Sequence, residues 1–241
     1  MARYWNEMNY PQPTESELKR NVKNTAQKAA AKGQELHPII IKSRQIATSW
    51  WGKAWCDNLE RYADYDTRLP RGRRYVKTGA VVDLQIKKGK IQARVQGTRK
   101  TPYKVEIRVS PLSEKRIGEI TEKCGAKVET LDKLVNGDFP KELKGVFLEK
   151  DGLFPKPREI SFNCSCPDWA VMCKHVAAVL YGVGARLDED PLLFFSLRGI
   201  NTNRFVDVVI SSRVEAMLRN VDRPSERIIQ ETKITDLFGV L

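Results

Sequence analysis

Twelve consecutive residues hold most of the metal-binding side chains of this sequence. The stretch CSCPDWAVMCKH, residues 164–175, contains three of the five cysteines and one of the two histidines of the chain. They form two pairs, each with one residue between its members: Cys164 with Cys166, and Cys173 with His175. Thiolate sulfur and imidazole nitrogen are ligands that Zn²⁺ takes in tetrahedral sites, and three Cys with one His is a standard set. The pattern therefore predicts one zinc ion bound by these four residues.

The expected ion is structural rather than catalytic, because four protein ligands leave no open coordination position. Other interpretations of the cysteines explain less. A Cys164–Cys166 disulfide would close a very tight ring, and the C-x-x-C spacing typical of redox pairs is absent. A nucleophilic cysteine with His175 as its base would leave two thiols without a role. In a reducing cytosol, clustered cysteines indicate metal binding or catalysis rather than disulfides, which a chain of this length does not need.

The segments on either side of this stretch fit such a site. Residues 159–163, EISFN, have strand character, and residues two apart in a strand point the same way, so one strand end can present the first pair of sulfurs. A Pro-Asp turn follows. Residues 173–187 carry apolar side chains at helical spacing, which places the second pair of ligands at the first turn of a helix. Strand, turn and helix start should surround the ion, with Trp169 available to cover it.

The predicted zinc-binding stretch resembles the zinc finger of a known protein family. C-x-C followed by C-x-H is similar to the SWIM zinc finger of prokaryotic Swi/Snf-type ATPases, plant transposases and several eukaryotic regulators. The blocks WWGKAW, RGRRYVKTGAVVDLQIKKGKIQARVQGTRKTPYKVEIRV, LVNGDFPKEL and CSCPDWAVMCKHVAAVLYGVGARLDEDPLLFFSLRG resemble the stand-alone prokaryotic SWIM zinc finger proteins over residues 40–200. The family's ligand positions carry over as Cys164, Cys166, Cys173 and His175. The resemblance implies binding to DNA or protein and a helicase-like, Swi/Snf-type ATPase as companion, with no reaction attached.

The charge of the chain is unevenly distributed. The formal net charge is +12; residues 1–117 hold 25 Lys and Arg against 11 Asp and Glu, whereas residues 118–241 hold 17 against 19. Such an asymmetry favours a polyanionic partner, nucleic acid before an anionic membrane, and the alternative is a basic surface that serves solubility. No apolar run approaches the roughly 18 residues of a membrane span. Because signal-peptide features are also missing, we expect a cytoplasmic protein without a membrane partner.

Alternating apolar residues predict an antiparallel sheet in the basic half, with a hairpin turn near Lys88-Gly89. Its core-facing residues are expected to be Val82, Leu84, Ile86, Ile91, Ala93, Val95, Tyr103, Val105, Ile107 and Val109. The opposite face is polar and basic, which an antiparallel sheet with one solvated side allows. This face carries Gln85, Gln92, Arg94, Gln96, Lys104 and Arg108.

Two arginine-rich stretches, RLPRGRRYVKTG and QGTRKTPYK, complete the predicted nucleic-acid surface. Guanidinium groups pair with phosphates, and nearby tyrosines can stack on unpaired bases. The candidate nucleic-acid-binding residues are Arg68, Arg71, Arg73, Arg74, Lys77, Arg94, Arg99, Lys100, Lys104 and Arg108. The alternative is that they are hairpin ends and solvated loops. No helix-turn-helix or RRM signature is present, so the sequence predicts binding without strong sequence preference.

The remaining candidate residues do not indicate catalysis. WWGKAW contains Gly-Lys but lacks the earlier Gly and the Ser/Thr of a phosphate loop. Its tryptophans fit either a core or a stacking platform, and we favour the core. His37 is expected to be exposed, and Cys56 and Cys124 to be structural. Since no free histidine and no clear acid/base pair remain, we predict no enzymatic activity.

These patterns predict an α+β protein: an antiparallel sheet with short helices, a small strand-turn-helix SWIM zinc finger and C-terminal helices. The expected segments are a basic, weakly structured arm at 1–38, a basic α+β domain at 39–158, the finger at 159–190 and a helical region at 191–241. Within the arm, Thr14 and Glu17 have the spacing of a capping box, so it is either a solvated helix or a segment that orders on binding.

The predicted function is that of a zinc-containing, nucleic-acid-binding accessory protein that works with a helicase-like ATPase. DNA is favoured over RNA as the partner. The alternative is a protein–protein interaction adaptor that makes no direct contact with nucleic acid. In that case the near-neutral second half would dock the ATPase, and the basic half would only be solvated surface.

Overall fold

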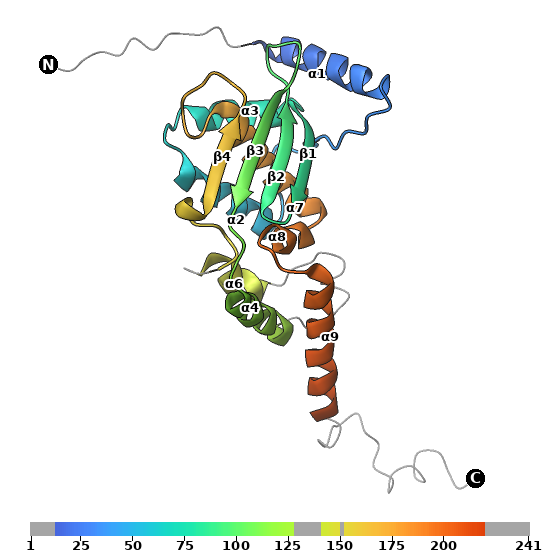
Figure 1. Cartoon of the computed structure of the whole chain (residues 1–241), viewed down its shortest axis with the longest axis vertical. Coiled ribbons are helices and arrows are strands. Elements are labelled where there is room, and N and C mark those ends of the chain that lie inside the picture. The colour runs from blue at the N-terminus through green and yellow to red at the C-terminus, as the bar shows by residue number, and fades with distance from the viewer. Residues whose placement is uncertain (1–12, 128–140, 150–151, 220–241) are drawn as a thin grey trace, which may run out of the picture.

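An antiparallel sheet of four strands in chain order is the centre of the fold (Figure 1). The computed structural model describes residues 13–127, 141–149 and 152–219. The strands are β1 (Val81–Lys87), β2 (Lys90–Val95), β3 (Tyr103–Val109) and β4 (Ile160–Cys164). Helices accompany the sheet, so the predicted α+β class is confirmed.

The predicted hairpin is confirmed, with one change in side-chain direction. Gly89 occupies the turn between β1 and β2 with a φ of +66°, a backbone conformation that glycine adopts without strain. A register shift between Val81 and Asp83 marks a β-bulge in β1. Because of it, Val81 belongs to the core, whereas Val82 lines a depression together with apolar side chains of α1 (Glu15–Ala30). Val82 is buried, as expected, but it is not part of the core cluster that contains Leu84.

The helix α7 (Lys174–Glu189) lies against one face of the sheet. The helices α3 (Arg68–Lys77) and α2 (Trp50–Leu59) pack against α7. Every residue of α7 from His175 to Gly184 is buried, as expected of a helix covered on all sides. Small residues let α3 and α7 approach closely: a Cβ on Gly72 would lie 2.6 Å from the Cβ of Ala177. The finger's helix is thus the core helix of the protein.

The tryptophans of WWGKAW belong to the core, as favoured. Trp55 is 1% exposed, and its Nε1 donates a hydrogen bond to the carbonyl of Leu180 at 2.8 Å. Trp51 Nε1 donates to the carbonyl of Leu187 at 2.9 Å. Both bonds join α2 to α7, so these indoles fasten the two helices together rather than offering a stacking surface.

The other helices lie at the two ends of the sheet. At one end α1 begins with the predicted capping box, in which Thr14 and Glu17 exchange hydrogen bonds, and crosses the end of the strands (Figure 1). At the opposite end α4 packs against α9, which extends away from the sheet (Figure 1). The bounds are α4 (Glu114–Lys127), α6 (Lys144–Leu148), α8 (Leu192–Leu197) and α9 (Thr202–Arg219), with the 3₁₀ turns η1 (Glu60–Tyr62), η2 (Lys141–Leu143) and η3 (Pro157–Glu159).

The zinc-finger segment shares the sheet with the basic half of the chain. β4 pairs with β3 from Val109 opposite Ile160 to Val105 opposite Cys164. The boundary expected between residues 158 and 159 therefore runs between two paired strands of one sheet.

Candidate metal centre

The four predicted ligands meet where β4 ends and α7 begins. Cys164 is the last residue of β4, Cys173 is the N-cap of α7, and His175 lies in its first turn. Their ligand atoms and the sulfur of Cys166 all lie within 4.8 Å of one another. This is the strand, turn and helix start that the sequence predicts.

The spacing of these atoms fits one zinc ion. Nδ1 of His175 is 3.9 Å from Sγ of Cys164 and 3.9 Å from Sγ of Cys173. Around tetrahedral zinc, with Zn–S near 2.3 Å and Zn–N near 2.0–2.1 Å, ligand atoms are roughly 3.5–3.8 Å apart. The donor set and its geometry therefore fit a single structural zinc held by Cys164, Cys166, Cys173 and His175.

The sulfurs of the cluster lie close enough to affect the protonation of one another. The pKa of Cys166 is lowered because the thiols of Cys164 and Cys173 hydrogen-bond to its sulfur. The pKa of Cys164 is raised because that thiol keeps its proton in the bond to Cys166. The three sulfurs thus share protons, which a metal ion would replace, since it binds thiolates. Burial lowers the pKa of His175 and keeps its imidazole in the neutral form that binds metals.

The ring of His175 is held in place by packing. It stacks on Tyr103 with centroids 4.2 Å apart, and the ring of Tyr75 meets it at 5.5 Å in a T-shaped arrangement. Its Nε2 is buried and has no hydrogen-bond partner among the described residues, so Nδ1 is the nitrogen that faces the sulfurs. Gly97 permits the close approach of this loop, because a Cβ there would lie 2.8 Å from Tyr103 and 3.5 Å from Nε2.

Trp169 does not cover the site, contrary to expectation. Its side chain is 78% exposed, while Tyr103 and Tyr75 flank His175 instead. The loop 167–172 turns outward because its backbone is fastened elsewhere: the carboxylate of Asp64 accepts hydrogen bonds from two of its N–H groups. Sequence spacing placed Trp169 near the metal but carried no information on its direction.

Several predicted nucleic-acid contacts are held by acidic partners. The four ion pairs are Arg68 with Asp168, Arg73 with Glu60, Arg94 with Asp83 and Arg108 with Glu106. In addition, Arg74 donates to the backbone carbonyl of Pro13. The other five candidates, Arg71, Lys77, Arg99, Lys100 and Lys104, form no ion pair with another described residue.

The candidates do not lie on one face of the molecule. Arg94 and Lys104 are cross-strand partners on the solvated face of the sheet, where Asp83 and Glu106 balance much of the positive charge. The residues of α3 lie on the other side of the sheet, beside α7. Gln96 was expected on the polar face but is 1% exposed. Its Oε1 accepts a hydrogen bond from the hydroxyl of Thr25 in α1, and its Nε2 donates one to the carbonyl of Arg99.

One group of basic residues was not among the predictions. α1 lies on the loop after β2, where Asn21 donates to the carbonyl of Gly97. This brings the exposed Arg20 and Lys23 of α1 to the zinc end of the sheet, and neither forms an ion pair with a described residue. The capping box and the basic positions of this helix are the signal that could have identified them.

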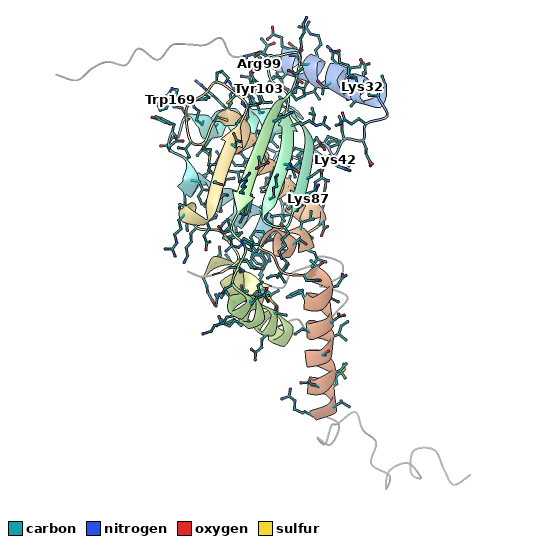
Figure 2. All side chains as sticks on the ribbon, in the orientation of Figure 1. Lys32, Lys42, Lys87, Arg99, Tyr103 and Trp169 are labelled. Atoms are coloured by element: carbon teal, nitrogen blue, oxygen red, sulfur yellow. The ribbon has the colours of Figure 1, made fainter. Side chains whose placement is uncertain are left out.

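Several cations at this end of the molecule form no ion pair with a described residue, and we call this group the basic end. It comprises Arg20, Lys23, Arg71, Arg99, Lys100 and Lys174. The guanidinium of Arg99 lies 5.0 Å over the ring of Tyr103, and the ammonium of Lys174 lies 5.8 Å over the ring of Tyr75. Since these two rings flank His175, Arg99 and Lys174 lie beside the metal centre. Figure 2 shows Arg99, Tyr103 and Trp169 on this end of the molecule; Lys32, in the turn that follows α1, is labelled at the same end.

The two remaining cysteines and the second histidine have no part in the site. Cys124 is buried, and burial raises the pKa of Cys56 to about 12, so its thiol stays protonated. His37 is exposed, as expected. Within the described ranges, no helix has the length and apolar character needed to cross a membrane.

Comparison with known proteins agrees with this site. The model of the SWIM zinc finger family matches residues 146–183, which contain all four ligands. The chain is 32% identical over 196 residues to the uncharacterized protein Rv2102 of Mycobacterium tuberculosis (strain ATCC 25618 / H37Rv), and the match covers 79% of this chain and 70% of that protein. No solved structure matches. This chain therefore belongs to the same family as Rv2102 and carries a SWIM zinc finger.

Proposed function

We propose that this protein binds nucleic acid through its basic end, without strong sequence preference and without catalytic activity of its own. We further propose that it does so in the cytoplasm as an accessory protein of a helicase-like, Swi/Snf-type ATPase, with DNA as the favoured nucleic acid. The observation that carries the proposal is a group of cations near the metal centre that form no ion pair with a described residue.

The difference between paired and unpaired cations supports this placement. An arginine that already holds a carboxylate must break that pair, or share it, to bind a phosphate. On the sheet face, Glu106 alone binds both Lys90 and Arg108. At the basic end, Lys23 and Lys100 are exposed and form no ion pair with a described residue, so a phosphate there need not displace a carboxylate of the described part of the chain.

The zinc ion would act as a structural support for this surface. When bound, it supplies a rigid link between the end of β4 and the start of α7. Its ligand His175 stacks on Tyr103, which in turn lies under Arg99. The position of at least one cation therefore depends on the order of the metal centre.

The test is a salt series with zinc-loaded protein and labelled single- and double-stranded DNA and RNA. The double variant K23Q/K100Q removes two unpaired cations. The matched control R73Q/R108Q removes the same formal charge from arginines held by Glu60 and Glu106. Each lost phosphate contact should reduce the slope of log K against log salt by about 0.7 on single strands or about 0.9 on duplex DNA.

We expect K23Q/K100Q to reduce the slope of log K against log salt by the amount that corresponds to about two phosphate contacts. The control should change this slope far less. Absence of binding to every probe even at low salt would contradict nucleic-acid binding altogether. Equal losses in the two variants would contradict the assignment to the basic end.

A protein-interaction adaptor is the second candidate, and one observation favours it. Four apolar side chains of α9 are exposed by 38–64%: Ile210, Val214, Met217 and Leu218. Exposed apolar side chains that gather on one element are typical of interaction surfaces. This candidate predicts no nucleic-acid binding in the salt series, so the same experiment decides between the two.

A further inference from the structure

The finger loop presents a large aromatic side chain to solvent. Trp169 is 78% exposed and is accompanied by Val171, 65% exposed, and Tyr65, 41% exposed. Figure 2 shows Trp169 at the outer edge of the molecule, on the end that also carries Arg99. Tryptophan is seldom left in water without a reason, because its burial contributes more than that of most side chains.

The loop that carries Trp169 is held firmly. The carboxylate of Asp64 accepts hydrogen bonds from the N–H groups of Val171, at 2.7 Å, and Met172, at 3.0 Å. Asp168 forms an ion pair with Arg68 at 3.2 Å. Cys166 and Cys173, on either side of the loop, are zinc ligands. An aromatic group fixed in this way binds a partner with little loss of conformational entropy.

A second aromatic ring supports the indole. The ring of Tyr65 lies 5.3 Å from that of Trp169 at an interplanar angle of 83°, a favourable edge-to-face arrangement. This contact restricts the rotation of the indole. Since the side chain is still mostly exposed, much of its surface remains available to a ligand.

Cations and carboxylates both lie near the loop that carries Trp169: Arg68, which pairs with the neighbouring Asp168, is one helical turn from Arg71 in α3. The ammonium of Lys174 interacts electrostatically with both Asp168 and Arg71. Asp168 is paired with Arg68, whereas Asp64 keeps its negative charge while its oxygens accept hydrogen bonds from two backbone N–H groups. Lys174 and Arg71 form no ion pair with a described residue, so they are the cations that an anionic ligand can approach here, and both belong to the basic end.

From this arrangement we propose that Trp169 stacks on an unpaired base, with the adjoining phosphates at Lys174 and Arg71, so that the protein prefers single-stranded nucleic acid. The inference rests on the proposed function and adds the strand form that is bound. Bases within a duplex stack on their neighbours, so only a base outside a helix offers its face to an indole. An apolar pocket of a partner protein fits this place less well, because covering Trp169 would also remove water from two unpaired cations.

The experiment compares zinc-loaded wild-type protein with the variants W169A, W169F, W169L and V171A on a labelled single strand and on a duplex of the same sequence. Stacking on one base predicts about 5- to 150-fold weaker single-strand binding for W169A, with duplex binding almost unchanged. W169F should keep most of the affinity because it keeps an aromatic face. V171A is the matched control: it removes an exposed apolar side chain of the same loop that cannot stack.

Several outcomes would overturn the proposal. Equal wild-type affinity for single strand and duplex, an unchanged affinity in W169A, or full affinity in W169L, which is apolar but not aromatic, would each exclude base stacking. If no probe binds at low salt, the proposed function itself fails, which is a different result. Because Trp169 is mostly exposed, its variants should keep their zinc and their thermal stability, and both are measured alongside.

Discussion

His175 stabilises the protein in two ways, as a zinc ligand and as a buried ring, and two substitutions separate these contributions. The ring is 3% exposed and stacks on Tyr103 at 4.2 Å. Removing it in H175A leaves a cavity between Tyr103 and Tyr75. Large-to-small substitutions of buried aromatic rings cost about 3–5 kcal/mol, and for the smaller imidazole we expect about 2–4 kcal/mol.

The zinc contribution adds to this packing loss. When free zinc is about 1,000 times its dissociation constant, binding stabilises the folded state by about 4 kcal/mol. H175A should lose both contributions, about 6–8 kcal/mol, which is a large part of the stability of a typical protein. H175C should lose mainly the packing contribution, because four cysteines are also a standard zinc ligand set.

The assay is urea unfolding followed by circular dichroism, once in a zinc buffer and once with a chelator, together with the zinc content of each protein. The chelator should lower the free energy of unfolding of the wild type and of H175C by a similar amount. It should leave H175A unchanged, because that variant has no zinc to lose. A variant H175A that retains one tightly bound zinc ion per chain, and that the chelator destabilises as much as the wild type, would refute the reasoning.

Two further predictions concern packing and pH. G72A should destabilise the protein by about 1–3 kcal/mol in urea unfolding, because the new Cβ would lie 2.6 Å from a side chain of α7; G118A, whose Cβ would meet nothing within 4 Å, is the control and should not destabilise. Burial lowers the pKa of His175 from 6.5, so the unfolded chain takes up this proton more readily than the folded one. The stability due to the neutral ring is therefore complete above pH 6.5 and is lost on acidification, as is zinc. Thermal midpoints from about pH 5 to about pH 8 should be constant in the upper range and fall below pH 6.5; a midpoint that rises on acidification would contradict this.

The metal ligands were predictable from the sequence because their geometry is local. Residues two apart at a strand end point the same way, and a helix start fixes the direction of the next pair, so spacing alone predicts that Cys164, Cys166, Cys173 and His175 meet. The sheet was predictable for a similar reason, since period-two alternation reports which face is buried. The alternation did not predict the β-bulge between Val81 and Asp83, because no residue type there is specific to a bulge.

Which charged side chains are available to bind a ligand, in contrast, was decided by the tertiary structure. Whether an arginine is free depends on which carboxylate lies beside it, and Arg68 pairs with Asp168, a hundred residues later in the chain. The direction of Trp169 depends on Asp64, which is equally remote in sequence. The sequence by itself determined which residues can bind a metal ion and that the first half is basic. Only the folded chain decided which cations remain unpaired and which aromatic ring faces the solvent, because both depend on contacts between segments that periodicity and spacing do not connect.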